Sequence, residues 1–300
     1  MHSVQSPVLP FNGFLRADQS DWFLLVAETV EAESLTRAPC RRTDRRWYNL
    51  PTPEPGRSML STLIRGAQQL GVELDAHQLD LFERYYRLLR SARSRINLTS
   101  VTGYEAVQQR HFLESLALLP ALRQVELMAP GRRERVLDLG AGAGLPGLPL
   151  KIAVPGLSLT LLEATARKAA FLREVVSELA LEQVEVLSGR AEEVARQANQ
   201  RQAYELVVAR AVAPLPTLLE LALPFLRIGG VLAAPKGSRA PREVTRSEGA
   251  LGLLGGKLLS VAPLAVPGAP RRSWLVLVRK VALTPEAYPR RPGIPAKRPL

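Results

Sequence analysis

The sequence has few residues of the kinds that build disulfides and metal centres. Its single cysteine, Cys40, excludes an intrachain disulfide. The three histidines, His2, His77 and His111, are far apart, and no histidine–cysteine cluster has the spacing of a zinc site. We therefore expect a protein without a catalytic metal.

Long apolar runs are also missing. No segment approaches the roughly 20 consecutive apolar residues that are needed to cross a bilayer. The apolar stretch 21–30 has no positively charged segment before it, and acidic residues interrupt the segment after it, so it makes a poor signal peptide. The expected location is the cytoplasm, without membrane association, and the expected state is a monomer.

Acidic residues are in the minority. The chain has 40 lysines and arginines against 28 aspartates and glutamates, which gives a net charge of +12. This balance favours a polyanionic partner, most simply nucleic acid, although the composition of a GC-rich genome would produce a similar excess of arginine. Between Arg271 and Leu300 there are eight basic residues and one acidic residue, a bias that favours contact with phosphate.

Changes in pattern divide the chain into four parts. Residues 1–58 mix prolines and arginines with short apolar pieces, which predicts a disordered extension or a mis-assigned start, since Met59 opens a helical pattern. A helical region is expected over 59–125, an α/β domain over 126–282 and a basic, proline-rich tail over 283–300.

The coarse secondary structure follows from apolar periodicity. Asp75 with Gln78 and Thr102 with Glu105 have capping-box spacing and mark two helix starts. Helices are predicted over 61–71, 79–90, 102–119, 146–153, 166–181, 191–199 and 215–226. Strands are predicted over 135–140, 158–163, 184–189, 204–210, 230–237, 258–266 and 273–280. Five strand–helix units followed by a hairpin predict a mainly parallel sheet with an antiparallel strand inserted late.

The stretch VLDLGAGAGLPGLPL (136–150) is a glycine-rich turn after a strand, which lets a nucleotide approach the backbone. Its glycines satisfy two patterns. Gly142-x-Gly144-x-x-Gly147 is a dinucleotide pattern, whereas Asp138-x-Gly140-x-Gly142-x-Gly144 is an S-adenosylmethionine pattern. Glu163, at the end of the second strand, is well placed to accept hydrogen bonds from the ribose hydroxyls of either ligand.

Charge decides between the two ligands. A carboxylate at Asp138 would repel a pyrophosphate but suits the cationic amino group of methionine. Ala191 and Glu192, after the third strand, could flank an adenine, and no residues resemble a hydride-transfer site. These observations predict a methyl donor.

The segment after the fourth strand narrows the choice of the methylated atom. Exocyclic amines are usually served by an (N/D)-P-P-(Y/F/W) turn, but the chain reads ARAVAPL over 209–215. Methylation of pyrimidine C5 needs a cysteine nucleophile, and Cys40 lies in the extension. An endocyclic nitrogen such as guanine N7 has a lone pair and no proton to remove, so it needs no general base.

The chain resembles the 16S ribosomal RNA guanine-N7 methyltransferases, the RsmG or glucose-inhibited division protein B family. The resemblance rests on NLTS (97–100), RHFLES (110–115), LDLGAGAGLPGLPL (137–150), LLEATARKAAFL (161–172), GRAEE (189–193), VVARAVAPL (207–215), PKG (235–237) and YPRRPGIPAKRPL (288–300). It implies a class I S-adenosylmethionine-dependent methyltransferase fold, Rossmann-like with a seven-stranded, mainly parallel sheet, and a helical N-terminal region. The implied cofactor is S-adenosylmethionine, and the implied partner is 16S rRNA or a precursor of the small ribosomal subunit.

The resemblance also implies site residues. The donor site would include Gly140, Leu145, Glu163, Ala164, Thr165, Ala166, Ala191, Glu192 and Arg210, in addition to Asp138, Gly142 and Gly144 of the glycine pattern above. Arg210 is the one catalytic candidate, as an organiser of the donor side rather than a proton carrier. Candidates for RNA contact are Asn97, His111, Lys236, Arg290 and Arg291. Family members usually have Asp-Ser where this chain has Glu114-Ser115, and the extra methylene moves the carboxylate.

Three alternatives stay open at this point. A methyltransferase of a small molecule or a protein would share everything except the basic tail and the N-terminal helical pieces. An NAD-dependent oxidoreductase would have to tolerate Asp138 beside a pyrophosphate. A non-catalytic rRNA-binding protein would keep the basic surface without binding a methyl donor.

Overall fold

The computed structural model describes residues 60–93, 95–101, 103–128, 133–269 and 273–300. The predicted extension 1–58 and Thr102 of the second predicted capping box lie outside the described residues. The helices are α1 (Ser61–Gln69), α2 (Ala76–Ala92), α3 (Tyr104–Val107), the π-helical turn η1 (Gln108–Leu113), α4 (Glu114–Leu116), α5 (Leu118–Gln124), α6 (Gly147–Ala153), α7 (Ala166–Glu178), α8 (Ala191–Val194), α9 (Leu215–Ala222), the 3-10 turn η2 (Leu223–Phe225), α10 (Ala240–Thr245), α11 (Glu248–Leu254) and α12 (Ile294–Lys297).

The described strands form one seven-stranded sheet in the order β3-β2-β1-β4-β5-β7-β6. The strands are β1 (Arg135–Leu139), β2 (Ser158–Glu163), β3 (Val184–Ser188), β4 (Tyr204–Val208), β5 (Leu226–Lys236), β6 (Gly256–Leu264) and β7 (Ser273–Lys280). β1 to β5 pair in parallel, while β7 is antiparallel to both β5 and β6. The prediction of a mainly parallel sheet with a late antiparallel insertion is therefore confirmed.

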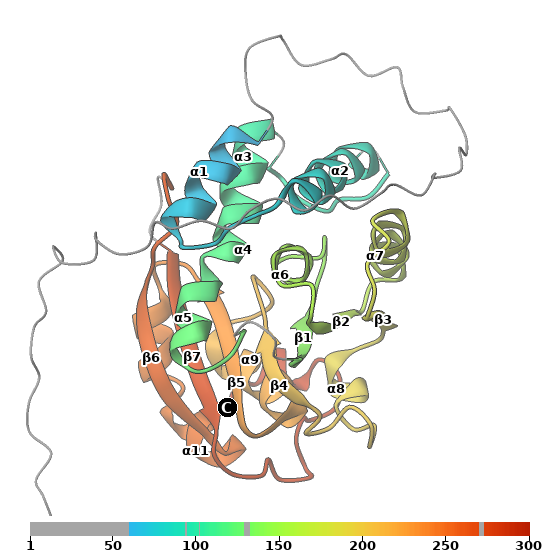
Figure 1. Cartoon of the computed structure of the whole chain (residues 1–300). Coiled ribbons are helices and arrows are strands. Elements are labelled where there is room, and N and C mark those ends of the chain that lie inside the picture. Colours follow the sequence, from blue (N-terminus) through green and yellow to red (C-terminus); the bar gives the residue numbers. More distant parts are fainter. Residues whose placement is uncertain (1–59, 94, 102, 129–132, 270–272) are drawn as a thin grey trace, which may run out of the picture. The chain divides into compact units, whose positions relative to one another are not determined.

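Both faces of the sheet are buried, and successive residues alternate between them. Val136 belongs to a core cluster with side chains of α2, α6 and α7, whereas Leu137 belongs to a second cluster with α9 and α11. Figure 1 shows α6 and α7 beside β1 to β3. Because side chains point alternately to opposite faces of a strand, continuous apolar runs such as 136–139 fit a sheet that is covered on both sides.

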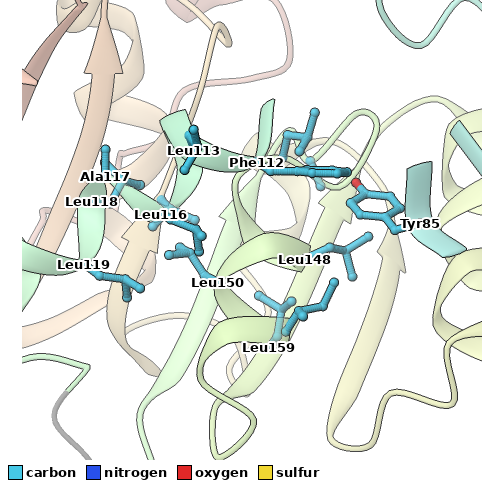
Figure 2. Close-up of a cluster of buried hydrophobic side chains, with 14 of the residues drawn as sticks. Tyr85, Phe112, Leu113, Leu116, Ala117, Leu118, Leu119, Leu148, Leu150 and Leu159 are labelled. Carbon is cyan, nitrogen blue, oxygen red and sulfur yellow. The ribbon is translucent and has the colours of Figure 1, made fainter. Parts of the chain in front are cut away.

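The N-terminal helices pack directly on the α/β part. The predicted capping box at Asp75 and Gln78 is confirmed, and the Gln78 amide also donates to the carbonyls of Ile152 (2.9 Å) and Ala153 (3.2 Å) at the end of α6. Figure 2 shows Phe112 and Leu116 against Leu148 and Leu150 of α6. All four of these side chains are fully buried. The apolar face of these helices therefore lies in the same core as the sheet.

Some predicted helices differ from the observed ones. The predicted helix 102–119 is interrupted by the π-helical turn η1, and the predicted helix 191–199 ends at Val194. α10 and α11 were not predicted, because Pro241, Gly249 and Gly252 lower their intrinsic helix propensity. Their buried side chains, such as Leu251 and Leu254, belong to the same buried cluster as the side chains of α9. Tertiary burial thus overrides local propensity here.

The C-terminal segment is held against the described core by side chains of the α/β part. Arg196 donates to the carbonyls of Glu286, Ala287 and Pro289. Arg201 donates to the carbonyls of Thr284, Pro285 and Tyr288. These bonds satisfy carbonyl groups of a proline-rich segment that has no strand partner.

Neither a membrane-spanning helix nor a metal cluster occurs among the described residues. No helix in this part of the chain is both long and apolar enough to cross a membrane. No group of three or more histidine, cysteine, aspartate or glutamate side chains there is arranged to hold a metal ion.

Lys280, the last residue of β7, is fully buried. Its ammonium donates to the carbonyl of Leu254, the last residue of α11, at 2.7 Å and to the hydroxyl of Thr284. Burial lowers the pKa of Lys280 from 10.5 to about 7, with a smaller contribution from the charge of Arg201. The side chain thus joins a helix end to the C-terminal segment, and its hydrogen-bond partners within the described ranges are uncharged.

We predict that Lys280 makes the stability depend on pH. Between about pH 7 and 10.5 the unfolded chain holds a proton on this lysine that the folded chain has released. The free energy of unfolding therefore rises with pH across that window, by at most about 1.4 kcal/mol per pH unit. Lys280→Met should flatten the rise, which urea unfolding across that window measures. Parallel curves for the two proteins would contradict the prediction.

Candidate active site

The candidate site lies where the parallel strands end. β1, β2 and β4 are neighbours in the sheet, and the segments that follow them begin at Gly140, Ala164 and Ala209. In open α/β sheets, ligands bind outside the carboxyl ends of the strands. The fold therefore brings the predicted loop after β1, the acid at the end of β2 and Arg210 to one edge of the sheet.

The glycines of the turn after β1 have different reasons to be glycine. Gly140, Gly142 and Gly144 all have positive φ, between 57° and 92°. A Cβ on Gly144 would lie 2.2 Å from Leu148, and one on Gly147 would lie 2.7 Å from Asp138. A Cβ on Gly142, by contrast, would have the carbonyl oxygen of Gly140 as its nearest atom, 3.8 Å away. Among these four glycines, Gly142 is thus the one with free space where a side chain would stand.

Glu163 joins this turn to the loop after β2. Its side chain is 7% exposed, Oε2 accepts the N–H of Gly142 (2.9 Å), and Oε1 accepts the N–H of Thr165 (2.8 Å). Each carboxylate oxygen can still accept a further hydrogen bond. Ala164, Thr165 and Ala166 are exposed beside it, so small side chains border the carboxylate.

Asp138 has a structural role that the sequence reasoning missed. It is fully buried, and its Oδ2 accepts the N–H of Gly147 at 2.8 Å, which anchors the first turn of α6. Its Oδ1 has no hydrogen-bond partner among the described residues. Burial raises the pKa of Asp138 to about 7, against the lowering effects of the Gly147 hydrogen bond and the Arg210 charge. Direct contact with the amino group of a methyl donor stays a prediction.

Tyr85 of α2 is a further residue that sequence reasoning missed. The side chain is fully buried, and its hydroxyl donates to the carbonyl of Ala143 in the glycine turn. Figure 2 shows the Tyr85 ring near Phe112 and above α6. Burial raises the pKa of Tyr85, so the hydroxyl keeps its proton. Only the apolar spacing of 79–90 hinted that this tyrosine faces the core.

Arg210 connects the end of β4 to the N-terminal helices. Its Nη1 donates to Glu114 Oε2 (3.1 Å) and to the carbonyl of Arg110 (3.0 Å). Glu114 Oε1 accepts the hydroxyl of Ser273 on β7 at 2.9 Å. Glu114 thus reaches both partners, and three segments of the chain meet at one carboxylate.

His111 lies on the π-helical turn, between Arg210 and the segment 95–101. Its Nδ1 is 3.3 Å from Arg210 Nη2, and its Nε2 is 2.7 Å from the hydroxyl of Thr99. Burial, with the nearby charge of Arg210, lowers the pKa of His111 to about 4. The imidazole is therefore neutral at physiological pH, where it links two elements by hydrogen bonds.

Glu192, predicted beside the adenine, contacts the C-terminal segment. The side chain is buried, and its Oε1 accepts the N–H of Gly293 at 3.0 Å. Ala191 is partly buried at the start of α8. The segment after β3 therefore lies between the end of that strand and the tail, and its contact with adenine stays a prediction.

Besides His111, two of the predicted RNA contacts have partners within the chain. The Lys236 side chain is 10% exposed, and its Nζ donates to Glu243 (2.8 Å) and to the carbonyl of Ala213 (2.6 Å). Arg290 forms a two-pronged pair with the fully buried Glu220 of α9, at 2.8 and 2.6 Å. These bonds account for both cations structurally. Their contact with phosphate stays a prediction, as it does for the exposed Asn97 and Arg291.

The residues present fit S-adenosylmethionine. The open backbone at Gly142 leaves room for the ligand's approach, and the Glu163 carboxylate beside it can accept hydrogen bonds from ribose hydroxyls. Asp138 Oδ1 is a buried acceptor without a partner in the described part of the chain. A nucleoside with a cationic end matches this set of acceptors.

The sheet order with its antiparallel insertion, the glycine turn after β1 and the acid ending β2 define the class: a class I S-adenosylmethionine-dependent methyltransferase fold. Within this class, the family model of GidB, described as rRNA small subunit methyltransferase G, matches residues 78–269. The chain belongs to this family.

Relatives with the name ribosomal RNA small subunit methyltransferase G support the assignment. The protein of Dehalococcoides mccartyi is 46% identical over 241 residues, which are 80% of this chain and 100% of the relative. The protein of Pelotomaculum thermopropionicum is 41% identical, over 81% of this chain and 99% of the relative. Among solved structures, M. jannaschii TYW2 in complex with AdoMet is 18% identical with a TM-score of 0.41, covering 54% of this chain and 74% of that one.

We predict that Gly142→Ala weakens binding of S-adenosylmethionine by about tenfold or more, because the new methyl group would occupy the open side of the turn. Gly71→Ala is the matched control, since Gly71 also has positive φ (64°) with no atom within 4 Å of its added Cβ, and it follows α1. Each variant should lose about 1–2 kcal/mol of stability from the left-handed backbone. Calorimetric titration should show weakened donor binding in Gly142→Ala alone, and equal affinities would contradict the assignment.

Proposed function

We propose that the protein transfers a methyl group from S-adenosylmethionine to N7 of a guanine in 16S rRNA. One observation carries the proposal: the open turn at Gly142 is joined to the ribose-type acceptor Glu163 in a chain of the rRNA small subunit methyltransferase G family. The excess of basic residues fits an RNA substrate.

The chemistry needs little from the chain beyond positioning. S-adenosylmethionine, when bound, supplies an electrophilic methyl group on a positively charged sulfur. Guanine N7 has an in-plane lone pair and no proton, so the guanine does not have to lose a proton before it attacks the methyl group. The chain must supply alignment of the two reactants at near-contact distance.

The residues at the strand ends divide this work. Glu163 holds the turn after β1 and the loop after β2 at a set separation, and it offers acceptors to a ribose. Arg210 and Glu114 hold the π-helical turn against the end of β4. His111, neutral at physiological pH, is a positioning group in this mechanism and carries no proton to or from the base.

The target guanine lies within 16S rRNA or a precursor of the small ribosomal subunit. The reaction takes place in the cytoplasm, and the enzyme acts as a monomer. Of the proposed parts, the helical region is 59–125, the methyltransferase domain 126–282 and the basic tail 283–300, while 1–58, an extension or a mis-assigned start, lies outside the described residues. A methyltransferase of another substrate is the alternative that shares this site.

The proposal predicts a missing modification in cells. Small-subunit rRNA from a strain that lacks the gene should have lost one N7-methylguanosine, and the wild-type gene should restore it, whereas a gene carrying Gly142→Ala should restore much less. Chemical cleavage at N7-methylguanosine followed by primer extension maps the position. An unchanged methylation pattern in the deletion strain would overturn the proposed substrate.

We expect Arg210→Ala to weaken donor binding and lower turnover, because it removes the proposed organiser of the donor side. The change also leaves Glu114 without its cation. Arg227→Ala is the matched control, since Arg227 pairs with Glu205 at 2.9 Å near the amino ends of β4 and β5. Calorimetric titration and a methyl-transfer assay measure the two effects. Unchanged affinity and turnover in Arg210→Ala would remove Arg210 from the donor side.

A further inference from the structure

A pocket of about 330 Å³ lies beyond the end of α2, lined by Arg93, Arg95, Ile96, Asn97, Thr99 and Ser100. Its volume is at the low end of the range for ligand sites, about 300–1,000 Å³, so it has room for one small group. Nearly all of its polar lining groups can donate hydrogen bonds, and none is a carboxylate. This chemistry suits an anion.

The two arginines give the pocket its charge. Both side chains are exposed, and Arg93 forms no ion pair with any residue that the structure describes. Arg95 pairs with Glu174 of α7 at 3.5 Å, which restrains its guanidinium without burying it. A guanidinium presents a planar fork of donors that matches the oxygens of a phosphate.

A short hydrogen-bond path connects the pocket to the end of β4. Thr99, in the pocket wall, is bonded to His111, which in turn contacts Arg210. The pocket is therefore beside the strand ends where methyl transfer is proposed. None of its lining residues lies on the loops after β1, β2, β3 or β4, which carry the proposed donor contacts.

We propose that this pocket binds a backbone phosphate of the substrate RNA, next to the nucleotide that carries the target guanine. The inference rests on the proposed function, since it assumes an RNA at the strand ends. An RNA backbone offers one anionic group per nucleotide, which suits a small pocket with two guanidinium groups and hydroxyl and amide donors around one apolar side chain, Ile96. Binding there positions the substrate through its backbone and leaves base recognition to other residues.

The test is the salt dependence of RNA binding to the full-length protein. Arg93→Ala and Arg95→Ala should each weaken binding of a 16S rRNA transcript and lower the slope of log K against log salt concentration, by at most the value of about 0.7 to 1 for one phosphate contact. Arg93→Lys should keep most of the slope because it keeps the charge. Arg246→Ala, on the exposed surface after α10, is the matched control for the loss of one positive charge and should leave the slope unchanged.

Donor affinity and rRNA methylation are the two measurements that separate this inference from the proposed function. All of these variants should keep the donor affinity of the wild-type protein, because the pocket is separate from the donor loops. If the wild-type protein methylates the rRNA but the two alanine variants keep the wild-type slope, the phosphate site is wrong and the proposed function stands. A pocket for a free small anion would bind inorganic phosphate by itself and leave the RNA slope unchanged, and that outcome also overturns the inference. Absence of methylation by the wild-type protein counts against the proposed function instead.

Discussion

The carboxylate of Glu163 holds together the two loops on which the candidate site depends. Parallel strands deliver their following loops to one edge of the sheet, where a backbone bond from the Ala141 N–H to the Leu162 carbonyl (3.0 Å) ties the turn after β1 to β2. Glu163 adds a second link by accepting the N–H groups of Gly142 and Thr165, one on each oxygen. Hydrogen bonds to a buried, charged acceptor are stronger than neutral ones, so the turn and the loop form one preformed surface.

A second set of contacts makes the N-terminal helices part of this surface. Tyr85 bonds to the glycine turn, and Glu114 joins Arg210 of the β4 end to Ser273 of β7. A methyltransferase that needs alignment rather than acid–base chemistry depends on such links, because small displacements of either reactant slow an in-line transfer. The same network leads through His111 and Thr99 to the pocket where we place an RNA phosphate.

Much of the architecture followed from the sequence. The apolar runs predicted all seven strands to within a few residues, and the capping box at Asp75 and Gln78 predicted the start of α2. The π-helical turn at Gln108–Leu113 was not predictable, because it depends on how the helix packs over the strand ends. α10 and α11 were missed because their glycines and proline hide helices that tertiary burial stabilises.

The class of ligand could be predicted from the residue pattern: an acid two positions before a glycine turn, a second acid ending the next strand and no evident general base point to a methyl donor and to an atom that has no proton to lose. The contacts of each charged side chain, in contrast, became known only in the folded chain. Asp138 anchors α6, Glu192 accepts a bond from the tail, and Lys236 and Arg290 pair with Glu243 and Glu220. The physical reason is that a motif specifies residue types along the chain, whereas the partner of a charge is set by segments far away in sequence that folding brings within hydrogen-bond distance.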